Sequence, residues 1–270
     1  MRFLLTNDDG IHAPGLAVLA RVMAKLGEVV VVAPDTERSG VAHAITLYAA
    51  LRLRELRPGW HECDGTPTDC VYLALHQLKI APDFVISGIN SGPNLGHDVL
   101  YSGTVAGALE GAHWGVPSLA ISHCTGQTER MGELEPLLDD LMPQLLQVAR
   151  SQLGAVNVNL PPVQLGPWQG VVPTKMGHRL YTDVVDARVD PRGRPYYWIG
   201  GNDVRMPDIA GSDCNAVRDG FVSVTPLGDD LTRHSELDAV ASVLADHRNT
   251  ISPRAPSAAE EPCLSPILLT

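Results

Sequence analysis

Two adjacent carboxylates, Asp8 and Asp9, follow a short apolar run near the start of the sequence. They lie between a predicted buried strand and a predicted helix. Neighbouring carboxylates at such a strand end repel each other and lose hydration, and a hard divalent cation such as Mg²⁺ or Mn²⁺ relieves both costs. For an arbitrary Asp-Asp-Gly sequence, a solvated turn with Asp as a helix cap is the commoner structure. The buried strand before the pair favours a metal site.

Two later segments carry further oxygen donors that suit a cation. Ser39 stands in Arg38-Ser39-Gly40 and can offer a hydroxyl ligand, although a Ser-Gly pair alone is usually a plain loop. The glycine-rich segment 87–96 contains Asn90 and Asn94. Their carboxamides can bind a cation through oxygen or a phosphate through nitrogen.

A phosphate site is also indicated at the start of a predicted helix rich in small residues. Ser102, Gly103 and Thr104 offer amides and hydroxyls at its N-terminus, where anions bind readily, and an ordinary N-cap is the alternative. Three histidines near these segments could protonate a leaving oxygen, although a structural or surface role is commoner for each alone. They are His12, His43 and His97.

The elements that must position these residues alternate between strand and helix in the first half of the chain. Apolar runs predict strands at 3–6, 29–32, 84–86, 116–121 and 155–160. Helical spacing predicts helices at 14–26, 67–78, 104–113 and 133–152, the second with Thr66 as N-cap. This order predicts an α/β, Rossmann-like, mostly parallel sheet with helices on both faces. Ligands bind at the carboxyl ends of the strands in such sheets.

The character of the sequence changes after about residue 161, where prolines interrupt the helical pattern. Residues 181–199 alternate polar and apolar side chains and predict extended hairpins, followed by a strand at 221–225 and a helix at 236–247. We expect residues 1–160 to form the catalytic core and 161–248 a hairpin and oligomerisation region. Residues 249–270, rich in Pro, Ser and Ala, are expected to form a mobile tail.

The charge and cysteine content of the sequence narrow the classes of function that the protein can have. The formal net charge of -11 disfavours binding of a nucleic-acid polymer, and any bound phosphate would need a metal ion, backbone amides or a helix N-terminus. The five cysteines form no C-x-x-C pair, which suits a reducing compartment. The first apolar run ends just before Asp8, so we expect no signal peptide. No apolar run approaches the roughly 20 residues that a membrane span needs, and we therefore expect no membrane span and a cytoplasmic location.

Several motifs agree in order and spacing with one known family, over about residues 1–245. The sequence resembles the stationary-phase survival protein SurE family. The matching segments are residues 5–10 together with 12–15, residues 33–35 together with 38–40, and residues 65–70. The segments 87–96, 101–104, 197–200 and 222–227 match it as well.

The resemblance implies a 5'/3'-nucleotidase that uses one divalent metal ion per subunit and is broad in nucleobase, with some members acting on polyphosphate. Carried over by position, the metal ligands are Asp8, Asp9, Ser39 and Asn90, with both aspartates at the catalytic centre. The resemblance also implies a homodimer or tetramer in which the hairpin region and C-terminal helix exchange between subunits. The implied phosphate contacts are Asn94, Ser102, Gly103 and Thr104.

Two alternatives remain open from the residues. Asp8 or Asp9 could be a nucleophile that forms an aspartyl-phosphate, although haloacid-dehalogenase-like enzymes usually present D-x-D rather than an adjacent pair. A signalling receiver domain also places an acidic pair after its first strand. It needs an Asp after the third strand, where this sequence has Gly88 and Asn90.

Overall fold

The structure is a computed structural model that describes residues 1–152, 154–163, 166–182, 185–200 and 203–245. The chain forms two compact units, Met1–Asp229 and Asp230–Thr270. The described part of the second unit contains a short 3-10 helix, η4 (His234–Glu236), and α6 (Leu237–Ala245). Helix α6 agrees with the helix predicted at 236–247 as far as residue 245, and the predicted tail at 249–270 lies outside the described residues.

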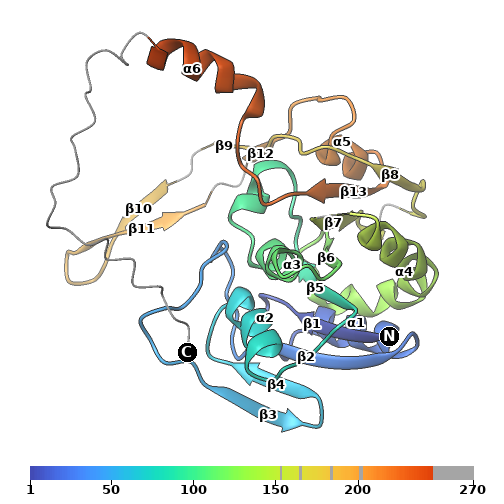
Figure 1. Ribbon diagram of the computed structural model, residues 1–270. Helices are drawn as coiled ribbons and strands as arrows, with labels where there is room; N and C mark the ends of the chain where they lie inside the picture. The colour runs from blue at the N-terminus through green and yellow to red at the C-terminus, as the bar shows by residue number, and fades with distance from the viewer. Residues whose placement is uncertain (153, 164–165, 183–184, 201–202, 246–270) are drawn as a thin grey trace, which may run out of the picture. The chain divides into compact units, whose positions relative to one another are not determined.

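A nine-stranded sheet forms the centre of the first unit (Figure 1). Its strand order is β3-β4-β2-β1-β5-β6-β7-β13-β8. Strands β1, β2, β4, β5, β6 and β7 run parallel, while β3 and β13 are antiparallel to their neighbours β4 and β7. In sequence order the strands are β1 (Arg2–Thr6), β2 (Glu28–Pro34), β3 (Leu53–Arg57), β4 (Trp60–Cys63), β5 (Phe84–Ser91), β6 (Ser118–His123), β7 (Ala155–Leu160), β8 (Val171–Pro173) and β13 (Val222–Leu227).

The order of the strands reverses beside β1. From β1 the chain builds outward through β2 and β4, and then returns to place β5, β6 and β7 on the other side of β1. A crevice at the carboxyl ends of β1 and β5 follows from this reversal, and it is the usual ligand site of an open α/β sheet.

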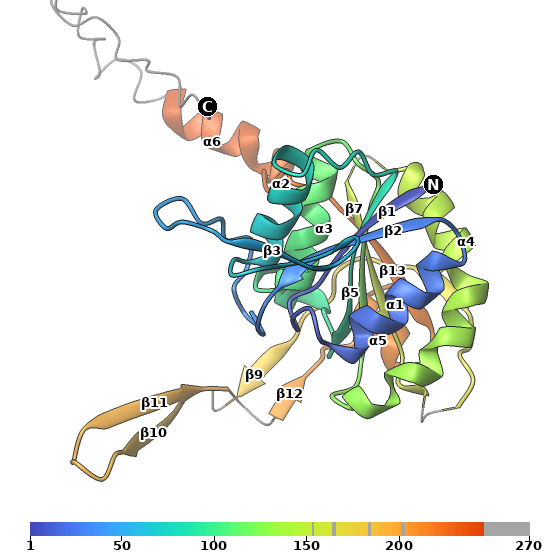
Figure 2. The same cartoon turned by 90° about the horizontal axis from the view of Figure 1, so that it is seen from below.

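Helices cover both faces of the sheet (Figure 2). Helices α1 (Pro14–Ala24) and α4 (Glu135–Arg150) lie on one face, and α2 (Pro67–His76) and α3 (Gly103–His113) lie on the other. The side chains of β1 point alternately to the two faces of the sheet. Phe3 and Leu5 pack with α1 and α4, whereas Leu4 packs with α2. These buried apolar layers fix the helix ends that face the crevice.

Local sequence signals explain where α2 and α3 begin. Thr66 and Asp69 form a reciprocal capping box at α2, with Pro67 at the first helical position. The Ser102 side chain accepts a hydrogen bond from Val105 N at the start of α3. The predicted cap at Thr66 is therefore confirmed.

The strand predicted at 84–86 is longer in the structure, because β5 continues to Ser91 and carries Asn90 within it. Its pairing with β6 shifts register between Gly88 and Asn90. A Cβ at Gly88, where φ is +139°, would lie 2.3 Å from Ile121 O. Glycine there permits the close pairing, so the glycine-rich sequence did not mark the end of the strand.

The region after residue 160 contributes two kinds of structure. Strands β8 and β13 join the central sheet, with α5 (Asp213–Arg218) between them in sequence. Two hairpin pairs fall in the stretch predicted as extended: β9 (Leu180–Thr182) with β12 (Asp203–Arg205), and β10 (Val185–Val189) with β11 (Pro195–Ile199). The division of the chain at residue 160 and the exchange between subunits stay predictions.

Candidate active site

A cavity of about 360 Å³ opens at the carboxyl ends of β1, β2 and β5, and α3 begins beside it. It brings together residues that are far apart in the sequence. Six of the eight predicted site residues line it, namely Asp8, Asp9, Ser39, Asn90, Asn94 and Ser102. The remaining two, Gly103 and Thr104, lie behind Asp8 at the start of α3.

Asp8 is held between the end of β1 and the first turn of α3. Its carboxylate accepts a hydrogen bond of 2.5 Å from Thr104 Oγ1. A Cβ at Gly103 would lie 2.8 Å from the Asp8 Cβ, so glycine allows the helix to approach this closely. Burial raises the pKa of Asp8 to about 6, partly offset by the Thr104 hydrogen bond, and the charge of Asp9 raises it further.

Asp9 lies against the end of β5. The backbone N–H of Ser91 donates to Asp9 Oδ2 at 3.1 Å. Burial raises the pKa of Asp9, the Ser91 hydrogen bond opposes this shift, and the nearby charge of Glu37 adds to it. Both aspartates therefore sit in surroundings that disfavour their ionised forms.

The two asparagines on and after β5 are fixed by hydrogen bonds. Asn90 Nδ2 donates to Gly92 O at 3.0 Å, so the side-chain oxygen of Asn90 is the atom that can accept a hydrogen bond or bind a cation. Asn94 Nδ2 donates to Ser122 Oγ at 2.7 Å, and Asn94 N donates to Asn159 Oδ1 at 2.9 Å. Asn94 is thus held by β6 and β7 at the edge of the cavity.

A set of supporting residues was not predicted from the sequence. Asn157 and Asn159 both donate from Nδ2 to the Asn94 carbonyl, at 2.8 and 3.0 Å. Their alternation within a buried strand of otherwise apolar residues is a signal that could have identified them. Asp98 also lines the cavity and accepts hydrogen bonds from Arg179 and Tyr181. Arg179 and Tyr181 lie more than 80 residues away, so no local pattern predicts this contact.

The side chains of this cavity fit a hard divalent cation. The predicted ligands are two carboxylates, a hydroxyl and a carboxamide oxygen, which are donors that Mg²⁺ and Mn²⁺ accept. Burial and, second to it, neighbouring carboxylates raise the pKa values of Asp8 and Asp9, and no Lys or Arg lines the described cavity to offset their charge. Within the described ranges no group of three or more His, Cys, Asp and Glu side chains is gathered as a metal site. A ligand set with only two carboxylates does not require such a group.

The three candidate histidines do not line this cavity. His43 Nε2 lies 3.0 Å from Glu110 Oε2, and the ring of His97 packs against that of His178 with centroids 4.2 Å apart. His12 is exposed. The general acid therefore stays unassigned.

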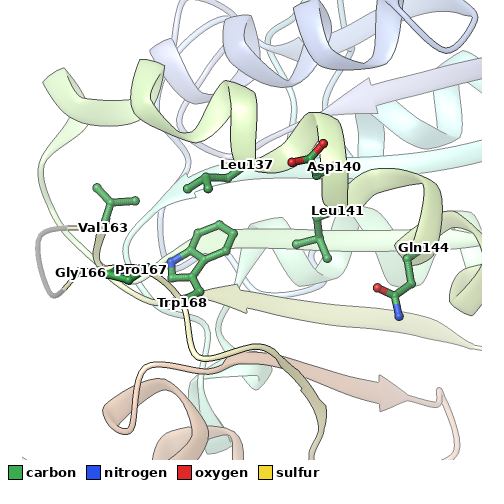
Figure 3. A pocket seen from close by; sticks show the side chains of 8 residues that line it. All are labelled: Leu137, Asp140, Leu141, Gln144, Val163, Gly166, Pro167 and Trp168. Atoms are coloured by element: carbon green, nitrogen blue, oxygen red, sulfur yellow. The ribbon is translucent and has the colours of Figure 1, made fainter.

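A larger cavity of about 650 Å³ lies between α4 and the segment that carries Val163 and Trp168 (Figure 3). Leu137 and Leu141 of α4 face Trp168 across it, and Asp140 and Gln144 lie at its margin. It contains none of the predicted site residues. Its walls are largely apolar, and it has one carboxylate, Asp140, where the smaller cavity has four.

Comparison with known proteins identifies the family of the chain. The family model described as Survival protein SurE matches residues 3–183. The 5'-nucleotidase SurE of Syntrophotalea carbinolica is 46% identical over 245 residues, covering 89% of this chain and 96% of that protein. The 5'-nucleotidase SurE of an Anaeromyxobacter species is 48% identical over 246 residues, covering 90% of this chain and 95% of that protein. The crystal structure of the SurE protein from Aquifex aeolicus matches with a TM-score of 0.76 at 37% identity, covering 90% of this chain and 100% of that one. The chain belongs to the SurE survival protein family.

Proposed function

We propose that this protein is a divalent-metal-dependent phosphomonoesterase that hydrolyses nucleoside 5'-monophosphates to nucleoside and phosphate. The activity named for its relatives, 5'-nucleotidase, supports the reaction class. The observation that carries the metal dependence is the charge of the cavity. Carboxylates from Asp8, Asp9, Glu37 and Asp98 line it. Arg179 pairs with Asp98, and among the described residues no Lys or Arg lines the cavity beside the other three. A phosphate dianion entering this cavity needs a cation between it and the carboxylates.

The proposed ligands are Asp8, Asp9, Ser39 and Asn90, each through a side-chain oxygen. A bound Mg²⁺ or Mn²⁺ would offset the charge of the phosphate and lower the pKa of the attacking water. Asp8 and Asp9 are the proposed catalytic residues, because their carboxylates would orient that water by accepting its hydrogen bonds. The nearly complete burial of Asp8 keeps its carboxylate in a fixed position for this task.

The proposed phosphate contacts come from the segment after β5 and from the start of α3. Asn94 and Ser102 line the cavity and can donate hydrogen bonds to phosphate oxygens. Gly103 and Thr104 lie behind Asp8 and would act through the positive end of α3, which favours negative charge at its first turn. Together they would stabilise charge on the phosphate as the ester bond breaks.

Other expectations from the sequence stay predictions. They are hydrolysis of 3'-monophosphates and of polyphosphate, one metal ion per subunit, assembly as a homodimer or tetramer, and a cytoplasmic location. Among the helices that the structure describes, none has the length and apolar character needed to cross a membrane.

Phosphate release from AMP tests the proposal. Activity should disappear with EDTA, return with Mg²⁺ or Mn²⁺, and fall by at least about 100-fold in Asp9→Asn. Asp140→Asn on the exposed side of α4 removes the same charge away from the site and should leave the rate unchanged. Full activity of the wild type in EDTA would refute the metal dependence. Trapping of a phosphorylated Asp8 or Asp9 would favour the aspartyl-phosphate mechanism instead.

A further inference from the structure

Glu37 is a carboxylate of the cavity that the family ligand set does not include. It follows β2 and stands two residues before Ser39. Ser39 Oγ donates a hydrogen bond to Glu37 Oε1 at 2.8 Å, and both side chains line the same cavity as Asp8 and Asp9. The hydroxyl proposed as a metal ligand therefore already has a partner in the protein.

The direction of this hydrogen bond determines what Ser39 can offer. A neutral serine hydroxyl binds a cation through a lone pair on oxygen, so its proton must point away from the cation. In the structure that proton points to Glu37, which leaves the lone pairs of Ser39 Oγ for another partner. Ser39 is exposed, and the next residue, Gly40, has open space around it. Without an acceptor such as Glu37, the hydroxyl would be free to rotate.

Glu37 lines the cavity in which a cation would sit, and its hydrogen bond there is with the Ser39 hydroxyl. Residues that orient metal ligands commonly change metal affinity by 10- to 100-fold when they are removed.

We propose that Glu37 is a positioning residue of the metal site: it accepts the Ser39 proton, orients the Ser39 oxygen toward the cation and so strengthens cation binding. This inference rests on the proposed metal-dependent function. Glu37 acts through Ser39 rather than as a direct ligand, so its effect depends on the presence of the serine hydroxyl.

Mn²⁺ binding to the full-length protein, measured by electron paramagnetic resonance and by titration calorimetry, tests this role without substrate. Glu37→Ala should weaken Mn²⁺ binding by roughly 10-fold. Glu37→Gln keeps an oxygen that can accept the Ser39 proton and should weaken binding less than Glu37→Ala does. Glu129→Ala removes an exposed carboxylate outside the cavity and should leave Mn²⁺ binding at the wild-type value.

A double-mutant cycle separates positioning from direct ligation. In a Ser39→Ala background, Glu37→Ala should weaken Mn²⁺ binding by no more than about 2-fold, since the hydroxyl it orients is gone. An undiminished 10-fold effect in that background would overturn the proposal, as would wild-type affinity in Glu37→Ala. A wild type that binds no Mn²⁺ would instead refute the proposed function itself, so the two failures are distinguishable.

Discussion

Replacing Asp8 by Asn is expected to stabilise the metal-free protein at neutral pH, although it removes a proposed metal ligand. Burial raises the pKa of Asp8 from its ordinary value of 3.8 to about 6. At about 1.36 kcal/mol per pKa unit, the ionised carboxylate costs the folded state about 3 kcal/mol. Asparagine carries no charge, and its side-chain oxygen can still accept the Thr104 hydrogen bond.

The sign of the pH dependence follows from the same values. Between pH 3.8 and about 6 the folded protein holds a proton on Asp8 that the unfolded chain has released. This contribution to stability is therefore fully present below pH 3.8 and is lost as the pH rises through about 6. The variant should match the wild type at the acidic end and exceed it by about 3 kcal/mol above pH 7.

Urea unfolding followed by tryptophan fluorescence, in EDTA at pH 4.5 and 7.5, measures this difference. Asp140→Asn is the control, because that carboxylate is exposed on α4 and its removal should change stability little. Adding Mn²⁺ at 100 times its Kd should stabilise the wild type by about 2.7 kcal/mol and the variant much less. If Asp8→Asn were no more stable than the wild type in EDTA at pH 7.5, the account of Asp8 as an uncompensated buried charge would be wrong.

Two further predictions concern the supports of the site. Asp69→Ala removes the Asp69 side-chain half of the capping box and both hydrogen bonds that Thr46 donates to this carboxylate. It should therefore lower the free energy of unfolding by roughly 2–4 kcal/mol in urea titrations, and a change below about 0.5 kcal/mol would contradict this. Gly103→Ala places a methyl group 2.8 Å from the Asp8 Cβ and should weaken Mn²⁺ binding by about 10-fold in calorimetry, whereas Gly132→Ala, with open space around it, should not. Equal Mn²⁺ affinity in the two glycine variants would contradict the argument.

The parts of the fold that were predicted from the sequence carry strong local signals. The apolar run ending at Thr6 and the Thr66-Pro67 start of α2 combine burial with a capping pattern that is readable along the chain. Strand β3 was missed because most of its residues are exposed and charged. Strand β8 and helix α5 were missed because they are too short to show a period.

The site was predictable where its residues follow strands. A carboxylate pair after β1 and a carboxamide on β5 must meet if the two strands are neighbours, so their convergence follows from topology. The hydrogen bond from Ser39 to Glu37 depends on the conformation of a loop. The ion pair between Arg179 and Asp98 depends on long-range packing. No spacing in the sequence specifies either contact. The family resemblance supplied the ligand set, which the residues alone left open.

The hydrogen bond between Thr104 and Asp8 has a consequence for how the protein is made. Its partners are separated by 96 residues, so at a synthesis rate of about 5–20 residues per second Asp8 is incorporated roughly 5–20 s before Thr104. Asn159, which holds Asn94, follows later still. Throughout that interval the carboxylate pair belongs to an unfinished nascent chain and remains hydrated. Capture of the proposed cation would therefore follow assembly of the sheet, and a ribosome-bound fragment ending before β7 should have no ordered metal site.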